Sequence, residues 1–249
     1  MSAGAIFVWE LLGTATLILL GNGVVANHVL RKNNGHNAGF LFINLGWAFA
    51  VFTGASIANP SGAHLNPAVT LGLAIANKTE WSDVPFYVAG QLVGAILGAI
   101  LCWATYKLQF DDHPEPENTL GIFSTGPQIA NTAWNLVTEI IGTFVLVAWI
   151  LLSPSFKAGD AGVPTFGNSA LGYAGVSFVV LVIGASLGGP TGYAINPARD
   201  LGPRIAYAFV LPIKNKANAN WGYSWIPVVG PLVGGAIAAL LYLAVHNLT

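Results

Sequence analysis

Long apolar stretches separated by short polar segments run along the whole chain. A membrane-spanning helix needs about 20 mostly apolar residues. Six stretches reach roughly that length, at about residues 5–26, 39–58, 84–106, 133–153, 170–188 and 223–245. Membrane-spanning strands would instead alternate apolar and polar residues over about ten positions. The pattern therefore predicts an all-α membrane protein with six transmembrane helices.

Two further apolar segments are too short to cross a membrane. They run from Asn66 to about Ala76 and from Asn196 to about Val210. About eleven helical residues cover about 16 Å, which is half of the ~30 Å hydrocarbon core. Both segments are therefore expected to be re-entrant half-helices that enter the membrane and end near its middle.

The order of these segments repeats within the chain. Residues 10–14 (ELLGT) match residues 139–143 (EIIGT), and the triplet Asn-Pro-Ala at 66–68 returns at 196–198. We expect a single channel domain over 1–249, with repeat 1 at about 1–108, a connecting loop at about 109–129 and repeat 2 at about 130–249. Each repeat holds three full spans. Because three is odd, the second repeat starts on the opposite side of the membrane, and the half-helices meet near the midplane.

Each Asn-Pro-Ala triplet has the chemistry of a helix start. Asparagine is a favourable N-cap, and proline fits the first helical position because its missing N–H would have no partner there. Each helix start carries about half a positive charge from the helix dipole. Two starts that face each other would repel cations at the membrane centre. The predicted pore residues of the triplets are Asn66, Pro67, Ala68, Asn196, Pro197 and Ala198.

The segments just before the two caps are expected to be non-helical. Irregular backbone at membrane depth is tolerated only inside protein or beside water. Carbonyl groups there could accept hydrogen bonds from a file of passing hydroxyl groups, opposite a wall of apolar side chains. This predicts an amphipathic pore for small neutral hydroxyl compounds, with carbonyls from Gly62, Ala63, His64, Gly192, Tyr193 and Ala194.

Composition narrows the function. Only 8% of the residues are charged and the net charge is −1, which indicates an integral membrane protein with no bulk attraction to nucleic acid. The single cysteine, Cys102, excludes an internal disulfide and is expected to be a packing residue. No metal spacing, nucleophile–base pair or phosphate loop is found. We therefore predict no enzyme activity, no cofactor and no metal.

Ionisable residues within the membrane segments each allow two interpretations. Arg199 is expected to donate hydrogen bonds to solute and to repel cations, and the alternative is an ion pair with Asp200 alone. Glu10 and Glu139 occupy equivalent places in the repeats. They are expected to accept hydrogen bonds from the non-helical backbone, with a proton relay as the alternative. His64 either lines a vestibule of the pore or packs against a neighbouring span.

The segments SGAHLNPAVT at 61–70 and GYAINPARDLGPR at 192–204 resemble the major intrinsic proteins, the family of the aquaporins and aquaglyceroporins. The resemblance covers nearly the whole chain. It implies the aquaporin-like fold, a homotetramer in the lipid bilayer of the plasma membrane, and passive conduction. It also implies that both termini are cytoplasmic, although the distribution of Lys and Arg over the loops favours the opposite orientation.

Asp200 and the pair Pro231-Leu232 look like the glycerol-conducting branch of that family. This branch implies glycerol and water as permeants, and urea is a further candidate. An ungapped alignment puts the family's selectivity filter at Gly46, Gly184, Tyr193 and Arg199. A shift of one residue would replace Gly46 with Trp47, and adjacent helical residues point about 100° apart. We expect Gly46 at the filter, hence a widened pore that Gly46→Trp would narrow. The alternative that follows from a widened filter is a channel whose main solute is a bulkier neutral compound, such as undissociated lactic acid or dihydroxyacetone.

Two other functions remain as alternatives. Coupled secondary transporters also contain broken helices and inverted repeats, but such a transporter needs ion-binding or titratable groups along its path. A closed, purely structural member of the family would show no solute flux.

Overall fold

The computed structural model describes residues 1–153 and 170–248, and every regular element in these ranges is helical. The elements are α1 (Ala3–Val29), α2 (Phe40–Ile57), η1 (Asn59–Ser61), α3 (Pro67–Ile75), α4 (Val84–Thr105), α5 (Lys107–Asp112), η2 (Pro116–Thr119), α6 (Leu120–Phe123), α7 (Thr132–Leu152), η4 (Ala170–Tyr173), α8 (Ala174–Leu187), α9 (Pro197–Ile205), the π-helical turn η5 (Ala206–Val210) and α10 (Ile226–His246). The predicted all-α class is confirmed.

Within the described residues, five helices are long and apolar enough to cross a membrane, namely α1, α2, α4, α7 and α10. The sixth predicted span, 170–188, is α-helical over only 14 residues in α8, because its first residues form the 3₁₀ turn η4. The polar segment that separates this span from the one before it falls mostly outside the described residues. The two predicted half-spans are the nine-residue helices α3 and α9.

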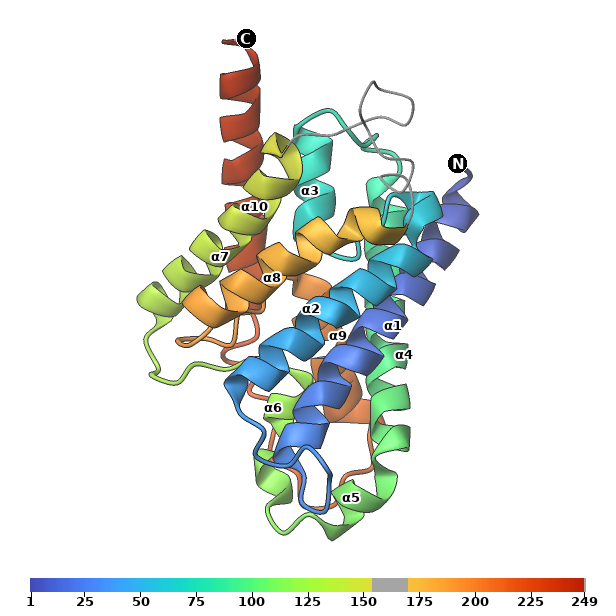
Figure 1. Ribbon diagram of the computed structural model, residues 1–249, viewed down its shortest axis with the longest axis vertical. Coiled ribbons are helices and arrows are strands. Elements are labelled where there is room, and N and C mark those ends of the chain that lie inside the picture. Colours follow the sequence, from blue (N-terminus) through green and yellow to red (C-terminus); the bar gives the residue numbers. More distant parts are fainter. Residues whose placement is uncertain (154–169, 249) are drawn as a thin grey trace.

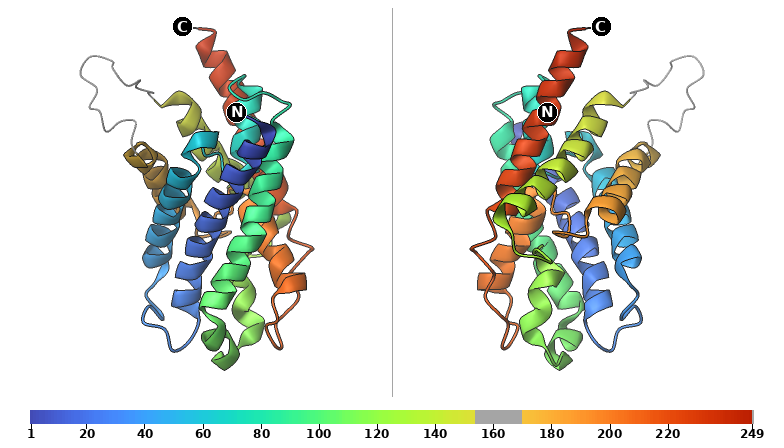
Figure 2. Two further views of the ribbon diagram at one scale, coloured as in Figure 1. Left: turned by 90° about the vertical axis from the view of Figure 1, so that its right-hand side faces the viewer. Right: turned by 90° about the vertical axis from the view of Figure 1, so that its left-hand side faces the viewer.

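The helices form an elongated bundle with the short helices α3 and α9 inside it (Figure 1). Helix α1 packs along α4 and α2, and α7 packs along α10. The start of α1 and the C-terminal end of α10 lie at one end of the bundle, and α5 lies at the other (Figure 1 and Figure 2). The two half-helices extend from the centre toward opposite ends, as an inverted repeat requires.

Two glycines at matching places let paired helices approach closely. A Cβ on Gly94 of α4 would lie 2.4 Å from the carbonyl oxygen of Leu11 in α1. A Cβ on Gly234 of α10 would lie 2.3 Å from the carbonyl oxygen of Ile140 in α7. Helices in lipid have no hydrophobic driving force for association. Small residues of this kind let the two backbones pack closely, and this close packing stabilises the pair instead. The α1–α4 and α7–α10 pairs are therefore built in the same way.

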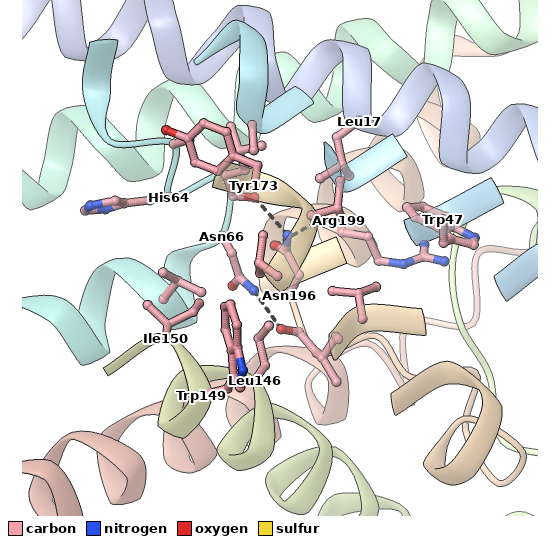
Figure 3. A pocket seen from close by; sticks show the side chains of 18 of the residues that line it. Leu17, Trp47, His64, Asn66, Leu146, Trp149, Ile150, Tyr173, Asn196 and Arg199 are labelled. Carbon is pink, nitrogen blue, oxygen red and sulfur yellow. Dashed lines mark hydrogen bonds between the residues drawn. The ribbon is translucent and has the colours of Figure 1, made fainter. Parts of the chain in front are cut away.

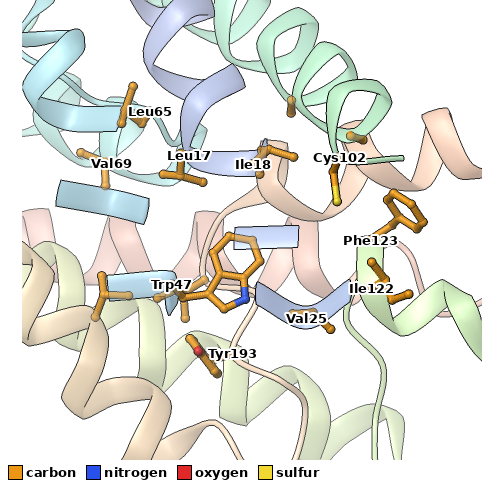
Figure 4. Packing of buried hydrophobic residues seen from close by; sticks show 14 of the residues in the cluster. Leu17, Ile18, Val25, Trp47, Leu65, Val69, Cys102, Ile122, Phe123 and Tyr193 are labelled. Carbon is orange, nitrogen blue, oxygen red and sulfur yellow. The ribbon is translucent and has the colours of Figure 1, made fainter. Parts of the chain in front are cut away.

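Buried apolar side chains fill the space between the helices (Figure 4). Trp47 lies among Leu17, Ile18, Val25 and Tyr193 in this cluster. Cys102 of α4 is fully buried there, as expected for a packing residue.

A buried ion pair fixes α9 to the connecting segment. The Asp200 carboxylate accepts hydrogen bonds from Arg204 Nε at 2.8 Å and from the backbone and hydroxyl of Thr125, both at 2.7 Å. Arg204 also donates to the carbonyls of Thr125 and Ala219, and both charged side chains are fully buried. Asp200 thus pairs with Arg204, so the alternative in which Arg199 only neutralises Asp200 is wrong.

Asp200→Asn is expected to destabilise the protein by about 3–5 kcal/mol, because it leaves the buried Arg204 without its counter-charge. The check is thermal unfolding of the purified protein in detergent. The matched control is Asp112→Asn, which removes the exposed partner of Lys32 and should change stability by less than about 1 kcal/mol. Equal effects of the two substitutions would contradict the structural role of the buried pair.

Candidate functional site

The two Asn-Pro-Ala triplets meet at the centre of the bundle. Asn66 Nδ2 donates to the carbonyl of Ile195 at 2.8 Å, and Asn196 Nδ2 donates to the carbonyl of Leu65, also at 2.8 Å. Each asparagine also caps its own half-helix: Asn66 Oδ1 accepts from the N–H of Ala68, and Asn196 Oδ1 accepts from those of Ala198 and Arg199. The predicted caps are confirmed. Since each amide has two N–H donors, one donor per asparagine is left for a solute.

The segments before the caps have the same irregular backbone in both halves. Positive φ angles occur at Gly62, Ala63 and Leu65 in the first segment and at Gly192, Tyr193 and Ile195 in the second. A left-handed conformation costs a residue with a side chain roughly 1–2 kcal/mol. Other contacts must therefore hold these segments in place.

Two buried carboxylates supply those contacts. Glu10 accepts hydrogen bonds from the backbone of His64 and Leu65 and from the side chains of Ser61 and Gln91, at 2.6–3.0 Å. Glu139 accepts from the backbone of Ala194 and Ile195 and from the Thr191 hydroxyl, at 2.7–3.0 Å. Both side chains are fully buried. The geometry supports the bracing role for both residues over a proton relay.

A cavity of about 240 Å³ passes the two asparagines (Figure 3). Its polar wall is made by residues 62–66 and 193–196, which contain the irregular segments. Apolar side chains also line it, including Leu17, Val51, Val69, Leu146 and Val180. The lining thus combines the irregular segments with apolar side chains, the two components that the sequence predicts for the pore.

Trp47 and Arg199 form one end of this cavity. The Arg199 guanidinium carbon lies 3.8 Å from the centre of the Trp47 ring system, a cation–π contact. Arg199 Nη1 donates to the carbonyl of Phe123 at 3.3 Å. Both side chains are more than 90% buried. A buried cation thus stands against the indole in the cavity wall.

The expected position of Gly46 in this wall is wrong, and the alternative, Trp47, lines the cavity instead. A Cβ on Gly46 would lie 2.4–2.6 Å from side-chain atoms of Val24, so Gly46 is the point where α2 crosses α1. The Trp47 ring has room because Gly21 of α1 lies beside it: a Cβ there would be 2.2 Å from the ring.

The remaining predicted site residues divide into wall residues and residues behind the wall. Tyr193, Ala194, Gly62 and Ala63 line the cavity. Gly184 lies behind it, where a Cβ would be 2.8 Å from Tyr193 Cζ, so this glycine makes room for the tyrosine ring. Gly192 is also absent from the wall, and a Cβ on it would meet the Thr125 side chain at 3.5 Å.

His64 combines both roles that the sequence allows. It lines the cavity, and its ring also stacks on Tyr87 with the centroids 3.9 Å apart. Its Nδ1 lies 3.1 Å from the Thr70 hydroxyl. Trp149 and Tyr173 line the cavity too, and the sequence patterns do not single them out. Their only signal in the sequence is that they are aromatic residues near the ends of predicted spans.

Residues 3–242 match the model of the major intrinsic protein family. A probable glycerol uptake facilitator protein of Thermotoga maritima is 47% identical over 96% of this chain and 98% of its own. Glycerol uptake facilitator protein 3 of Lactiplantibacillus plantarum is 49% identical over 94% of this chain and 93% of its own. The crystal structure of the aquaglyceroporin from Plasmodium falciparum is 31% identical, with a TM-score of 0.79 over all of both chains.

Proposed function

Because this chain belongs to the major intrinsic protein family, we propose that it is a passive membrane channel that conducts glycerol, other small neutral solutes and water, and that excludes ions and protons. The observation that carries this proposal is the amphipathic cavity that passes both helix-capping asparagines. The similarity to glycerol uptake facilitators supports glycerol as the main solute.

The two sides of the cavity suit the two sides of a polyol. Hydroxyl groups can accept hydrogen bonds from Asn66, Asn196 and Arg199 and donate to carbonyls of the irregular segments. The carbon backbone of the solute passes along the apolar wall. A solute that keeps its hydrogen bonds in this way loses little free energy when it leaves water.

Trp47, Tyr193 and Arg199 are the side chains that we assign to the selectivity filter, with Gly184 as the residue that makes room for Tyr193. Since an indole stands where Gly46 would have left space, the filter is narrower than the sequence predicts. The proposal of a bulkier main solute, such as undissociated lactic acid or dihydroxyacetone, thereby loses its main premise. These compounds and urea remain minor candidates. Stopped-flow light scattering on proteoliposomes at low pH measures the permeabilities of water, glycerol and lactic acid and so ranks these three permeants.

Two sources of positive electrostatic potential support the exclusion of cations. The helix starts at Asn66 and Asn196 direct the positive ends of α3 and α9 at the cavity centre. Arg199 adds a full positive charge at one end of the same cavity.

Arg199→Val is therefore expected to raise the leak of protons or Na⁺ through proteoliposomes at least about tenfold, since a unit charge at short range in a protein is worth several kcal/mol. Glycerol flux should persist. The proton leak is measured with a pH-sensitive dye trapped inside the vesicles, and the Na⁺ leak with a trapped Na⁺-sensitive dye. The control is Arg31→Val, in the exposed segment after α1. A leak that does not change in the Arg199 variant would show that this charge is not part of the barrier.

The cavity lining favours a channel over a coupled transporter. Among the described residues, those that line the cavity include no Asp or Glu, and Glu10 and Glu139 lie outside its wall. The part of the cavity wall that the structure describes therefore offers no carboxylate ligand for a coupling ion.

The assembly that we propose is a homotetramer in the plasma membrane with both termini in the cytoplasm. Large apolar side chains are exposed on the long helices, including Phe49 at 59% and Leu240 at 59%. Lipid or neighbouring copies of the chain would cover these side chains. We also propose that the chain forms one channel domain, in which a connecting segment at about 109–129 joins the two repeats.

A further inference from the structure

We propose that Asn44 of α2 is a positioning residue of the selectivity filter: its carboxamide pairs with the Tyr193 hydroxyl and so fixes the Tyr193 ring in the cavity wall. The Asn44–Tyr193 pair lies behind that wall. This inference rests on the proposed function, and it adds a residue that determines the width of the filter without touching the solute.

The Tyr193 ring is held between α2 and α8, which pack side by side (Figure 1). On the α8 side, a Cβ on Gly188 would lie 2.4 Å from Tyr193 Cδ1, and a Cβ on Gly184 would lie 2.8 Å from Tyr193 Cζ. On the α2 side, the Phe40 ring meets the Tyr193 ring edge-on, with the ring centroids 6.3 Å apart. These two glycines and Phe40 are not among the described residues that line the cavity. The ring therefore reaches the cavity from a seat behind its wall.

Asn44 lies at the hydroxyl end of this ring. The same Cβ position on Gly184 would lie 2.7 Å from Asn44 Oδ1 and 3.0 Å from Asn44 Cγ. Because this one position is close to both Asn44 Oδ1 and Tyr193 Cζ, the carboxamide and the phenolic carbon are neighbours. Asn44 also follows Phe40 by four residues, so both lie on the face of α2 that meets the tyrosine.

Both polar groups of the pair are buried. Asn44 is 1% exposed and Tyr193 is 7% exposed. Among the described residues, neither Asn44 Oδ1 nor the Tyr193 hydroxyl has another hydrogen-bond partner. Buried polar groups are nearly always paired, because an unmade hydrogen bond is costly inside a protein. A hydroxyl donor beside a carbonyl acceptor meets both needs, after a small rotation of either side chain or through one water molecule.

The pair connects two parts of the filter. Asn44 comes three residues before Trp47, so neighbouring turns of α2 supply one side chain of the filter and the support for another. The Tyr193 hydroxyl oxygen is itself buried although its ring lines the cavity, so this oxygen serves the pair and does not face the solute. Polar side chains of membrane helices hydrogen-bond across helix interfaces in this way. The position of the Tyr193 ring relative to Trp47 is thus set by α2.

The test is a double-variant cycle that measures xylitol and glycerol flux in proteoliposomes by stopped-flow light scattering. The variants are Asn44→Leu, Tyr193→Phe and the double variant. Each single substitution frees the ring and should raise the ratio of xylitol flux to glycerol flux at least about threefold. The double variant should show no higher ratio than the single variants, because both substitutions remove the same contact.

Thr143→Val is the matched control. The Thr143 hydroxyl is also fully buried and has no partner among the described residues, but it lies where α7 packs on Gly234 of α10. This substitution removes a buried polar group that does not touch Tyr193, so the flux ratio should stay at the wild-type value.

A wild-type flux ratio in Asn44→Leu or in Tyr193→Phe would overturn the positioning role, even if thermal unfolding shows that the variant is less stable. Changes that multiply in the double variant would show that the two side chains act separately, and would overturn the pair. If Asn44→Leu does not fold, Asn44→Ala takes its place in the cycle. Wild-type glycerol flux no greater than in empty liposomes would instead refute the proposed function, and this inference with it.

Discussion

Replacing Trp47 with Ala is expected to open the channel to polyols that the wild type excludes. The indole fills one side of the cavity end and stacks with Arg199, so its removal widens that end and leaves the guanidinium without its aromatic contact. We expect xylitol permeability to rise about tenfold or more relative to glycerol, as contacts of this size discriminate between solutes. Stopped-flow light scattering with the two polyols measures the ratio.

Two further variants test whether a change in this ratio comes from the side chain of Trp47. Trp47→Phe keeps an aromatic ring and should give an intermediate ratio, which guards against a loss of folding in the alanine variant. Trp81→Ala removes a tryptophan that is 57% exposed and should leave the ratio unchanged. A ratio that stays at the wild-type value in both Trp47 variants would exclude this residue from the filter.

Gly46→Trp serves as the reverse experiment. If Gly46 faced the cavity, the new indole would narrow the pore and would reduce the flux of bulky solutes more than the flux of water. The structure predicts a different result, because even a Cβ at this position would lie within 2.6 Å of Val24. We therefore expect little folded protein from this variant.

Glu139→Leu is expected to abolish correct folding. The substitution leaves three buried donors without an acceptor, namely the Thr191 hydroxyl and the N–H groups of Ala194 and Ile195. Each orphaned donor costs about 1–3 kcal/mol, so the total is roughly 3–9 kcal/mol, which is comparable with the whole stability of many domains. Thermal unfolding in detergent and the yield of monodisperse protein measure the effect.

The comparison with Glu139→Gln separates bracing from proton transfer. Glutamine keeps the shape and one acceptor oxygen, so stability should fall by less than in the leucine variant. Glu117→Gln, at an exposed position, is the control and should have no effect. A Glu139→Leu protein that folds and conducts glycerol like the wild type would refute the bracing role. Normal stability combined with altered proton leak would instead favour the relay.

The half-helices and their caps could be predicted because their chemistry is local. Asparagine followed by proline specifies a helix start within a few residues, and the internal repeat shows that the two starts are equivalent. The same repeat made Glu10 and Glu139 recognisable as a pair. Their bracing role followed because irregular backbone in a membrane needs fixed hydrogen-bond partners.

The residues of the filter could not be predicted from the sequence with the same accuracy, because their positions depend on how the helices pack. Counting twenty residues back from Asn66 reaches Gly46, but the contact with Val24 turns that position toward α1 and brings Trp47 to the cavity. A glycine in a membrane helix is as compatible with a close helix crossing as with an open pore. Trp149 and Tyr173 were missed for a related reason: they reach the cavity through the long-range placement of α7 and α8, and no local motif marks them.

The most direct measurement of the central claim is glycerol uptake into proteoliposomes, followed by stopped-flow light scattering with and without ionophores that collapse proton and Na⁺ gradients. A passive channel predicts glycerol flux well above that of empty liposomes, proportional to the glycerol gradient and unchanged by the ionophores. Flux that the ionophores abolish, or flux no greater than in empty liposomes, would contradict the account.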